Sequence, residues 1–412
     1  MNGKKARVAI PRRQVVVHEG MLDDLVRYCV QGNRDDADII GEFERRFARF
    51  VGVAHAVAVS SGRQGLRAIV RALGLTRGSR ILVPAYTYRA VVQALRAEGM
   101  VPVFVDIRAM DHNMDLAAVD AAASDAQAVI ATHIFGNPLE MDRLLAIAGR
   151  NGLVVIEDCA HALGATSGDR QVGSFGRASF FSFGATKLFN TFGGGMVATS
   201  DAELAARLRE QALDLPPMKT GPLASKALVF MLLAAVTRPR AFSWTLYPVL
   251  LLSDSLQMDV IELYERLAKP AAEVGLIETG FHPLQARWGI QGLLRLDADL
   301  ARRRQVYQDL DARLEPRIER LRPAAGGCRA PYFYIVMHPE RNALKRFLLK
   351  AGIDTGNLVM DNCPHMFGME GAYPMTVRAR MESVQIPVFP WFTDREIDRI
   401  AGCLNGFFEK LQ

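Results

Sequence analysis

Lys187 is the residue of this chain whose surroundings most clearly indicate chemistry. It lies in the stretch 178–196, between an apolar run with Phe180, Phe181 and Phe183 and the triple glycine at 193–195. An ammonium group among aromatic side chains is partly desolvated, which lowers its pKa and makes a neutral amine available for a Schiff base. On this stretch alone, the alternative is a lysine whose stem packs on the phenylalanines while its head reaches water.

The carboxylate of Asp158 is a second group that could do chemistry, because it ends the apolar run that begins at Leu153. Glu157 comes directly before it, but adjacent strand residues point to opposite faces, which disfavours a glycosidase with paired carboxylates. Asp158, His133 and His161 could also hold a metal ion. No HExxH or CxxC spacing supports such a site, and we predict no metal.

The segment 60–64 has the pattern of a phosphate-binding turn. It follows the short apolar strand predicted at 56–59 and precedes a helical pattern that continues to Leu73. Backbone N–H groups at the start of a helix, together with the positive end of the helix dipole, attract an anion. The pattern is weak alone, because many strand-to-helix turns have it without a ligand.

Alternating strands and helices are predicted to position these groups. The predicted strands are 56–59, 80–83, 101–106, 128–131 and 153–158, and the predicted helices are 64–73, 90–98, 116–123 and 141–150. Nearly continuous apolar strands, each followed by a helix, indicate a largely parallel sheet covered on both faces. Ligands bind at the carboxyl ends of such strands. The segments at 60–64, 86–89, 133–137 and 158–161 are therefore expected to meet Lys187 in one pocket.

The remainder of the chain predicts a smaller α+β domain. Its expected elements are a long helix at 284–314, a strand at 332–337, a helix at 342–351, a strand at 383–390 and a helix at 394–411. We therefore expect an N-terminal helical segment at 1–50, a large domain at 51–265 and a small C-terminal domain at 266–412.

An unusually apolar segment at 222–252 interrupts the large domain. Its two apolar runs, 226–236 and 241–252, are each shorter than the roughly 20 residues that span a bilayer. We expect a helical hairpin that is buried against the body or against a second subunit. The alternative is a segment that lies on a membrane surface, with Arg238 and Arg240 at the headgroups and Trp244 and Tyr247 at the boundary.

Composition and charge narrow the class of protein. The chain has 412 residues, of which 50% are apolar and 23% charged, so two or more globular domains are expected. The net charge of +6 is scattered rather than gathered in blocks, which disfavours a nucleic-acid-binding arm. Five widely spaced cysteines without a CxxC, and a basic start without a following apolar core, favour a reduced cytoplasm.

Taken together, Lys187, Asp158, the phosphate turn and the pair Tyr86 and Tyr88 have the chemistry of a pyridoxal 5'-phosphate site. A lysine amine binds the aldehyde, and a carboxylate keeps the pyridine nitrogen protonated so that the ring accepts electrons. A helix N-terminus binds the phosphate, and an aromatic side chain stacks on the ring.

The chain also resembles a known family, the DegT/DnrJ/EryC1/StrS sugar aminotransferases, which have the aspartate-aminotransferase fold. No single motif is decisive, but their order and spacing together are specific. The matching motifs are EFE at 42–44, VSSG at 59–62, VPAYTY at 83–88, PVFVD at 102–106, HIFGNP at 133–138, VIEDCAHALGA at 155–165, FSF at 181–183 before Lys187, GGG at 193–195, PLQA at 283–286 and IPVFP at 386–390.

This resemblance implies a fold and a set of roles. The fold is the pyridoxal-phosphate-dependent transferase fold type I, with a mostly parallel seven-stranded sheet. Lys187 would bind the cofactor and carry the proton between substrate and cofactor, and Asp158 would pair with the pyridine nitrogen. His161, where many relatives have glutamine, would lie near the phenolic oxygen, although a histidine that only packs in the core is the alternative.

The resemblance also implies the remaining contacts to the cofactor. Tyr88 would stack on the ring, unless it only packs. Ser182 would bind the phosphate together with the backbone of Gly62, Arg63 and Gln64.

Several positions depart from the family pattern. Arg63 replaces the usual threonine and Gln64 a small residue, while Phe192 stands where glycine is common. Glu278 and Gly280 replace an asparagine and an arginine of a segment that reaches the neighbouring subunit's cofactor in relatives.

The expected function is transfer of an amino group from glutamate or a similar donor to a nucleotide-linked keto-sugar, in surface-polysaccharide or glycoside biosynthesis. The expected assembly is a cytoplasmic homodimer without nucleic acid, with the membrane contact of 222–252 as the alternative noted above. Lys187 argues against the family's dehydratase branch, which has histidine there. The alternatives are a keto-cyclitol substrate, or a protein that binds pyridoxal phosphate or a membrane without catalysis.

Overall fold

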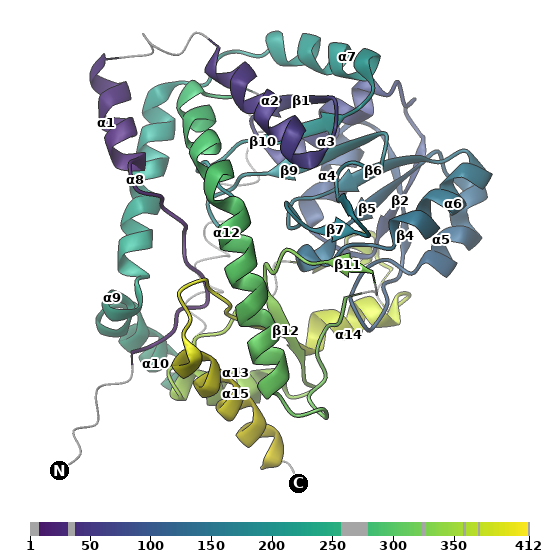
Figure 1. Cartoon of the computed structure of the whole chain (residues 1–412). Coiled ribbons are helices and arrows are strands. Elements are labelled where there is room, and N and C mark those ends of the chain that lie inside the picture. The colour runs from purple at the N-terminus through teal and green to yellow at the C-terminus, as the bar shows by residue number, and fades with distance from the viewer. Residues whose placement is uncertain are drawn as a thin grey trace, which may run out of the picture.

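A computed structural model describes residues 8–31, 38–256, 279–323, 326–356, 360–369 and 371–410 of the chain. A central sheet of seven strands, in the order β1-β10-β9-β6-β5-β2-β4, organises the large domain (Figure 1). Its strands are β1 (His55–Val59), β2 (Arg80–Pro84), β4 (Val101–Val105), β5 (Ala128–Thr132), β6 (Val154–Asp158), β9 (Ala178–Ser182) and β10 (Gly195–Thr199). Strand β10 runs antiparallel to both of its neighbours, β1 and β9, and the other neighbouring pairs of this sheet are parallel. The predicted fold class, a mostly parallel sheet of seven strands, is therefore confirmed.

Helices cover both faces of this sheet. They are α2 (Ile39–Val51), α3 (Gly62–Ala72), α4 (Arg89–Ala97), α5 (Leu116–Ala122), α6 (Met141–Asn151) and α7 (Ala202–Leu213). Successive residues of β2 alternate between the two faces, because strand side chains point to opposite sides. Ile81 joins the core under α3 and α4, whereas Leu82 joins the core under α5 and α6. The sheet is buried on both sides, as its continuous apolar strands predict.

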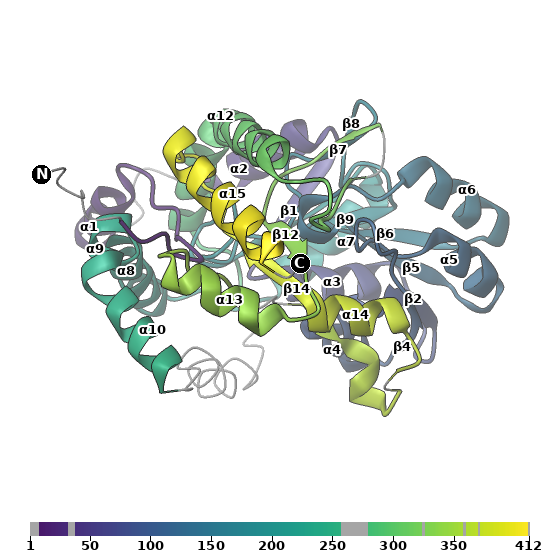
Figure 2. The same cartoon turned by 90° about the horizontal axis from the view of Figure 1, so that it is seen from below.

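The smaller C-terminal part packs beside the large domain and is seen from below in Figure 2. It contains α12 (Pro283–Arg313), β12 (Tyr334–Met337), α13 (Arg341–Lys350), α14 (Pro374–Glu382), β14 (Ser383–Ile386) and α15 (Asp394–Glu409). Strand β14 ends four residues earlier than the predicted 383–390 because Pro387 has no N–H for the ladder. A capping box between Thr393 and Glu396 starts α15, as the sequence suggests.

Short elements complete the described residues. They are β3 (Tyr86–Thr87) with β13 (Asp361–Asn362), β11 (Gly327–Cys328) with β7 (Thr166–Ser167) and β8 (Arg170–Gln171), and the 3-10 turns at Ala123–Asp125, Ile134–Gly136 and Cys363–Phe367. Residues 8–20 cross the small domain before α1 (Met21–Gln31) begins.

The apolar segment forms α8 (Thr220–Val236), α9 (Pro239–Trp244) and α10 (Leu246–Ser255). One face of α8 is buried in a cluster with α1 and α12, and Figure 1 shows the three helices side by side. Helix α10 instead lies against α13, where the Tyr247 hydroxyl donates to the Leu349 carbonyl at 2.9 Å. The two runs are thus helical as predicted, but they pack on different parts of the body. None of the described helices is both long and apolar enough to span a membrane.

Candidate functional site

A cavity of about 310 Å³ opens at the carboxyl ends of β1, β5, β6 and β9. The sequence-predicted residues that line it are Gly62, Arg63, Tyr88, Asp158, His161, Ser182 and Lys187. Segments distant in the sequence therefore do meet in one place, because strands of a parallel sheet end at the same edge. Of the predicted site residues, Gln64 does not line this cavity.

Lys187 lies in the turn after β9, where its backbone N–H donates to the Gly184 carbonyl at 2.8 Å. Burial lowers the pKa of its amine from 10.5 to about 8; the charge of Asp158 opposes this shift and that of Arg13 adds to it. The amine nitrogen also lies 5.3 Å from the ring centre of Tyr332. At pH 7.5 a lysine with a pKa of about 8 is neutral in roughly a quarter of molecules, so a nucleophilic amine is present.

Asp158 ends β6 and is 6% exposed. Its Oδ1 accepts a hydrogen bond from the Ala160 N–H at 3.0 Å. Burial raises the pKa of this carboxyl, while that hydrogen bond and the charges of Lys187 and His133 lower it. A buried carboxyl in this position is well suited to pair with one further cation, since such a partner would favour its ionised form.

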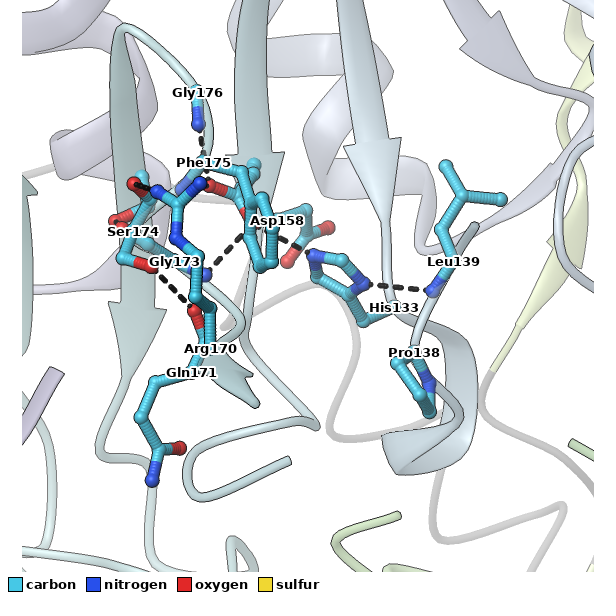
Figure 3. A network of polar contacts seen from close by, with 12 residues as sticks. His133, Pro138, Leu139, Asp158, Arg170, Gln171, Gly173, Ser174, Phe175 and Gly176 are labelled. Atoms are coloured by element: carbon cyan, nitrogen blue, oxygen red, sulfur yellow. Dashed lines mark hydrogen bonds and ion pairs between the residues drawn. The ribbon is translucent and has the colours of Figure 1, made fainter. Parts of the chain in front are cut away.

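Behind Asp158, the side chain of Glu157 points to the opposite face of β6 and is fully buried. It accepts N–H bonds from Gly173, Phe175 and Gly176 at 2.7–2.8 Å and lies 3.1 Å from His133 Nε2. His133 Nδ1 accepts from the Leu139 N–H, so Nε2 carries the proton that it shares with Glu157 (Figure 3). Glu157 is a structural anchor for the 173–176 turn.

The hydrogen bonds of Glu157 and His133 also bear on whether these residues bind a metal ion. His133, Glu157 and Cys159 each have a ligand atom within 4.8 Å of the others. However, Glu157 and His133 already use these atoms in hydrogen bonds, and burial raises the pKa of the Cys159 thiol well above its usual value. Both observations oppose metal binding, since a metal needs a thiolate and vacant lone pairs.

The turn at the start of α3 forms the opposite end of the cavity. Ser61 caps the helix, because its hydroxyl accepts from the Gln64 N–H at 3.2 Å. A Cβ built on Gly62 would lie 3.1 Å from the Cβ of Ser182, so a larger residue would press the turn away from the strand. The Gln64 side chain turns back to accept from the N–H and hydroxyl of Ser60 at 2.7 and 2.6 Å. Gln64 thus shapes the turn.

Two cations approach this glycine turn. Arg63 lines the cavity from α3, and Lys226 lines it from α8. The Lys226 amine lies 2.9 Å from the position that a Cβ on Gly193 would take. Lys226 is exposed as a whole residue, but partial desolvation of its amine lowers its pKa, and the charge of Arg63 lowers it further. Two positive charges that line one cavity favour a bound anion.

Aromatic side chains form the remaining walls. His161 is 8% exposed and stacks on Tyr332, with ring centres 4.4 Å apart; burial lowers its pKa well below 6.5, so it stays neutral at pH 7. Tyr88 caps α4 and remains 44% exposed at the rim. Tyr86 is fully buried against His112 and does not line the cavity, so only one tyrosine of the predicted pair reaches it.

Two buried hydroxyl groups without hydrogen-bond partners indicate that the cavity suits a polar ligand. The Thr132 and Thr87 hydroxyls have no hydrogen-bond partner among the described residues, and both residues line the cavity. Such groups cost free energy unless a ligand or water satisfies them. An amine, a carboxyl and an anion cradle around one cavity fit an aldehyde-bearing, protonated-ring phosphate such as pyridoxal phosphate.

Sequence reasoning missed Lys226, which lines the site from a helix that reads as purely apolar. The signal was present, since Lys226 is a charged residue at the start of the apolar run 226–236. A single charged residue in such a run indicates that its side chain has a polar partner. That partner, the turn at Gly193, lies 33 positions away, so the run itself does not identify it.

Comparison with known proteins agrees with this arrangement. Residues 24–219 match the DegT/DnrJ/EryC1/StrS aminotransferase family, which confirms the resemblance predicted from the motifs. The chain is 38% identical over 208 residues to UDP-N-acetyl-3-dehydro-alpha-D-glucosamine 3-aminotransferase of Acidithiobacillus ferrooxidans, covering 49% of this chain and 56% of that one. It is 28% identical over 406 residues to dTDP-3-amino-3,4,6-trideoxy-alpha-D-glucose transaminase of Micromonospora megalomicea, covering 94% and 95%. The chain spans about half the length of the first curated relatives that it matches.

A solved structure also shares the fold. The PLP form of Spr1654 from Streptococcus pneumoniae aligns with a TM-score of 0.76 at 21% identity, over 98% of this chain and all of that one. This structure shows the fold alone, and the family match covers residues 24–219, a little under half of the chain.

Proposed function

We propose that this member of the DegT/DnrJ/EryC1/StrS family is a pyridoxal-phosphate-dependent aminotransferase. It moves an amino group from glutamate or a similar donor to a nucleotide-linked keto-sugar, in the biosynthesis of surface polysaccharides or glycosides. The observation that carries the proposal is the pair of half-buried Lys187 and buried Asp158, which line one cavity together with a glycine turn and two cations. The names of the relatives, two of which are aminotransferases of UDP- and dTDP-linked sugars, support the substrate class.

When bound, pyridoxal phosphate supplies an aldehyde that reacts with amines and a protonated ring that accepts the electrons of a carbanion. The Lys187 amine would hold this aldehyde carbon, because its lowered pKa leaves it partly neutral near pH 7.5. The same nitrogen, when free, would act as the base and acid that moves the substrate proton.

Asp158 has the role of holding the proton on the ring nitrogen. Its carboxyl is buried beside Lys187, and the Ala160 N–H fixes its orientation. The neighbouring Glu157 keeps β6 and the 173–176 turn in place through its three N–H bonds. A carboxylate that is held in advance stabilises developing charge without having to reorganise.

The glycine turn has the role of binding the phosphate. The backbone at Gly62 and Arg63, the hydroxyl of Ser182 and the side chains of Arg63 and Lys226 line this end of the cavity. Gln64 acts indirectly, since it orders Ser60 rather than facing the cavity. A helix N-terminus and two cations together suit a phosphate dianion.

Tyr88 and His161 have the role of positioning the ring. Tyr88 lies at the cavity rim, where its aromatic face is available for stacking. His161 is neutral and held by Tyr332, so it can share a hydrogen bond with the phenolic oxygen without adding a charge.

Absorbance spectroscopy and borohydride trapping test the proposal. Purified protein with pyridoxal phosphate should show the absorbance band of the lysine-bound cofactor, and reduction should fix the cofactor to Lys187. Glutamate should convert that band to the band of the aminated cofactor. If Lys187→Ala is still trapped at another lysine, the assignment is wrong; if glutamate leaves the band unchanged, a non-catalytic binding protein is favoured instead.

The acceptor is tested separately by glutamate-dependent amination of a panel of keto-substrates. Nucleotide-linked keto-sugars should react, and free keto-cyclitols should not. Reaction with a keto-cyclitol alone would favour that alternative substrate class.

We also propose that the protein is a cytoplasmic homodimer whose interface includes the exposed face of α8. That face carries Leu228, Val229, Leu232 and Leu233, each at least 39% exposed. Exposed apolar patches of this kind usually mark a protein or membrane contact. A second copy is the occupant we favour, and a membrane surface is the alternative that the experiment below distinguishes.

A further inference from the structure

Tyr332 contacts two residues of the proposed cofactor site from outside the cavity that would hold the cofactor. It lies in the segment between α12 and β12 and is 7% exposed. It lines two small spaces beside Lys187, of about 10 and 30 Å³, but not the main cavity. Any effect of Tyr332 on the reaction must therefore act through the residues that it contacts.

The chain around Tyr332 is joined to the turn that follows β5. The Ala330 N–H donates to the Gly136 carbonyl at 3.0 Å, and the Tyr332 N–H donates to the Phe135 carbonyl at 3.4 Å. Gly136 has a φ of +83°, and a Cβ at this position would lie 1.7 Å from the Ala330 carbonyl oxygen. Only glycine permits this approach. Tyr332 is thereby fixed relative to the carboxyl ends of the strands.

Two aromatic rings fix the orientation of His161. Tyr332 stacks on it with ring centres 4.4 Å apart and an angle of 21° between the ring planes. Phe135 also stacks on it, at 6.1 Å and 14°. Phe135 adopts a φ of +54°, which is uncommon for a residue with a Cβ. The plane of the His161 ring, which is expected to lie beside the phenolic oxygen of the cofactor, is therefore set by its aromatic neighbours.

Tyr332 also contacts the turn of Lys187 in two ways. The Lys187 Nζ lies over the Tyr332 ring, 5.3 Å from the ring centre. The Tyr332 hydroxyl donates to the Thr186 carbonyl at 3.0 Å, so it holds the backbone directly before the lysine. The negative face of an aromatic ring attracts an ammonium group, but it has no basic atom that could take the proton. The ring therefore favours the protonated lysine while the proton stays on its nitrogen.

The other groups around the Lys187 amine are charged or titratable. Burial and the charge of Arg13 oppose the protonated amine, whereas the carboxylate of Asp158 favours it. His161 is neutral, because burial lowers its pKa well below 6.5. Tyr332 is a neutral phenol, since burial raises its pKa and a backbone carbonyl accepts its hydroxyl proton in a hydrogen bond. Tyr332 thus adds an attraction without a charge and is not itself a proton-transfer group.

We propose that Tyr332 is a positioning residue of the site: its ring holds the protonated Lys187 amine and the plane of His161, and its hydroxyl fixes the lysine turn. The inference rests on the proposed aminotransferase function. A lysine that takes up a substrate proton becomes a cation, and the ring face stabilises that cation beside the cavity. The nitrogen then stays within reach of the atom to which the proton must be returned.

Two replacements that keep the shape of the side chain test the ring of Tyr332. Competitive labelling of the cofactor-free protein with acetic anhydride, followed by mass spectrometry, gives the pH midpoint at which Lys187 becomes reactive. Tyr332→Phe keeps the ring and should leave this midpoint unchanged. A fluorinated phenylalanine at position 332 has a weaker negative face. It should lower the midpoint by about 0.5–1 pH unit, because the neutral amine then appears at lower pH.

Hydrogen exchange tests the hydroxyl of Tyr332. Tyr332→Phe removes the bond to the Thr186 carbonyl, so the amide hydrogens of residues 184–188 should exchange about threefold to tenfold faster, as for one lost hydrogen bond. The Lys187 amide is the most direct probe, since it donates to the Gly184 carbonyl within this turn. Unchanged exchange would show that the hydroxyl does not hold the turn.

Tyr334 provides a matched control. It is fully buried two residues further along the chain, and its ring packs on Tyr307 with ring centres 4.4 Å apart. The same two replacements at Tyr334 should leave the Lys187 midpoint and the exchange of residues 184–188 unchanged. Equal effects at both tyrosines would reflect a general loosening of the fold and would overturn the positioning role.

The outcomes separate this inference from the proposed function. In the cofactor-loaded protein, the pH profile of the half-reaction with glutamate should also move to lower pH in the fluorinated variant. A Lys187 midpoint that stays the same or rises in that variant overturns the positioning role of the ring, while the enzyme assignment stands. Wild-type protein that shows no lysine-bound cofactor overturns both.

Discussion

At the scale of single residues, burial sets the chemistry of Lys187. The protonated form of Lys187 is less favourable in the folded chain than in the unfolded chain, where its pKa is the ordinary 10.5. The folded protein therefore carries a cost in stability at neutral pH, which is explained if Lys187 has the proposed catalytic role. Asp158 offsets part of this cost, since its charge raises the pKa of Lys187.

The first prediction follows from this cost. Between the folded pKa of about 8 and the unfolded value of 10.5, the unfolded chain binds more protons, so stability rises with pH. Lys187→Met removes the titration and should raise the free energy of unfolding of the cofactor-free protein at pH 7 by up to about 3 kcal/mol. Urea denaturation at pH 7 and pH 9.5 checks it. The gain should shrink at the higher pH, and a gain independent of pH would contradict the explanation.

Phe192 has an unfavourable backbone conformation, and its packing in the structure explains it. Its φ of +57° is left-handed, a conformation that costs a residue with a side chain about 1 kcal/mol. In return, the fully buried ring packs edge-on against Trp288 of α12 at 5.2 Å and stacks on Phe230 of α8 at 6.4 Å. Phe192 therefore packs on α8, the helix formed by the unusually apolar segment, and this contact explains the phenylalanine at a position with positive φ.

The second prediction uses that conformation. Phe192→Ala should destabilise the protein by about 3 kcal/mol through lost packing, whereas Phe192→Gly should cost about 1 kcal/mol less, because glycine tolerates positive φ. Phe47, equally buried but in the helix α2, is the matched control. There the order should reverse, since glycine costs about 1 kcal/mol more than alanine in a helix. Thermal or urea unfolding of the four variants measures their stabilities. If the glycine variant is more stable than the alanine variant at both positions, or less stable at both, the argument from backbone strain is wrong.

At the scale of elements, the ends of the strands carry the site and α8 completes it. The glycine turn, Asp158 and Lys187 all follow strands of the sheet, but Lys226 arrives from a helix outside the alternating pattern. Because Phe192 packs on α8, the Lys226 amine lies close to the turn at Gly193. The apolar packing of α8 thus positions one charged side chain at the cavity.

The third prediction separates the phosphate from the rest of the cofactor. Lys226→Met should weaken binding of pyridoxal phosphate by about threefold to tenfold, a modest effect because the residue is partly exposed. Binding of pyridoxal, which lacks the phosphate, should be unchanged. Absorbance titration of both compounds measures it, with Lys219→Met as a control that removes an exposed lysine at the start of α8. An equal loss for both compounds would mean that Lys226 acts on the fold rather than on the phosphate.

At the scale of the whole molecule, one side of the protein remains apolar toward solvent. Besides the exposed side chains of α8, Val249 and Leu252 of α10 are 50% and 61% exposed. These helices lie on the same side of the molecule in both views (Figures 1 and 2). Covering such a surface with a second copy would remove apolar area from water at about 25 cal/mol per Å².

The fourth prediction concerns this surface. Replacing Leu228 and Leu232 together by glutamate should convert the dimer to a folded monomer, because buried charges without partners oppose association. Sedimentation velocity measures the mass, and near-ultraviolet circular dichroism verifies the fold. Leu213→Glu, an exposed leucine on α7, is the control and should not affect the mass.

Flotation with vesicles of anionic lipid tests whether this apolar surface binds a membrane instead of a second copy. Wild-type protein should stay with the soluble fraction. If it floats and the double variant does not, the surface binds a membrane, and the dimer proposal for α8 is wrong.

The amino-acid sequence by itself determined the fold class and the centre of the site. Apolar strands alternating with helices require a parallel sheet, and the residues after 59, 158 and 182 must then gather at one edge. These are consequences of short-range periodicity, which is visible in a single stretch of chain. The bounds of most strands and helices were therefore close to those predicted.

Only the tertiary structure decided what joins that centre from elsewhere. It placed Arg13 and Gln385 beside Lys187, brought Lys226 to the glycine turn, buried Tyr86 and turned Gln64 back on Ser60. Glu278, one of the predicted departures, lies outside the described residues. Contacts between residues hundreds of positions apart depend on how separate elements pack. No local pattern encodes that packing, and so the contribution of Lys226 to the proposed phosphate site could not be predicted from the sequence.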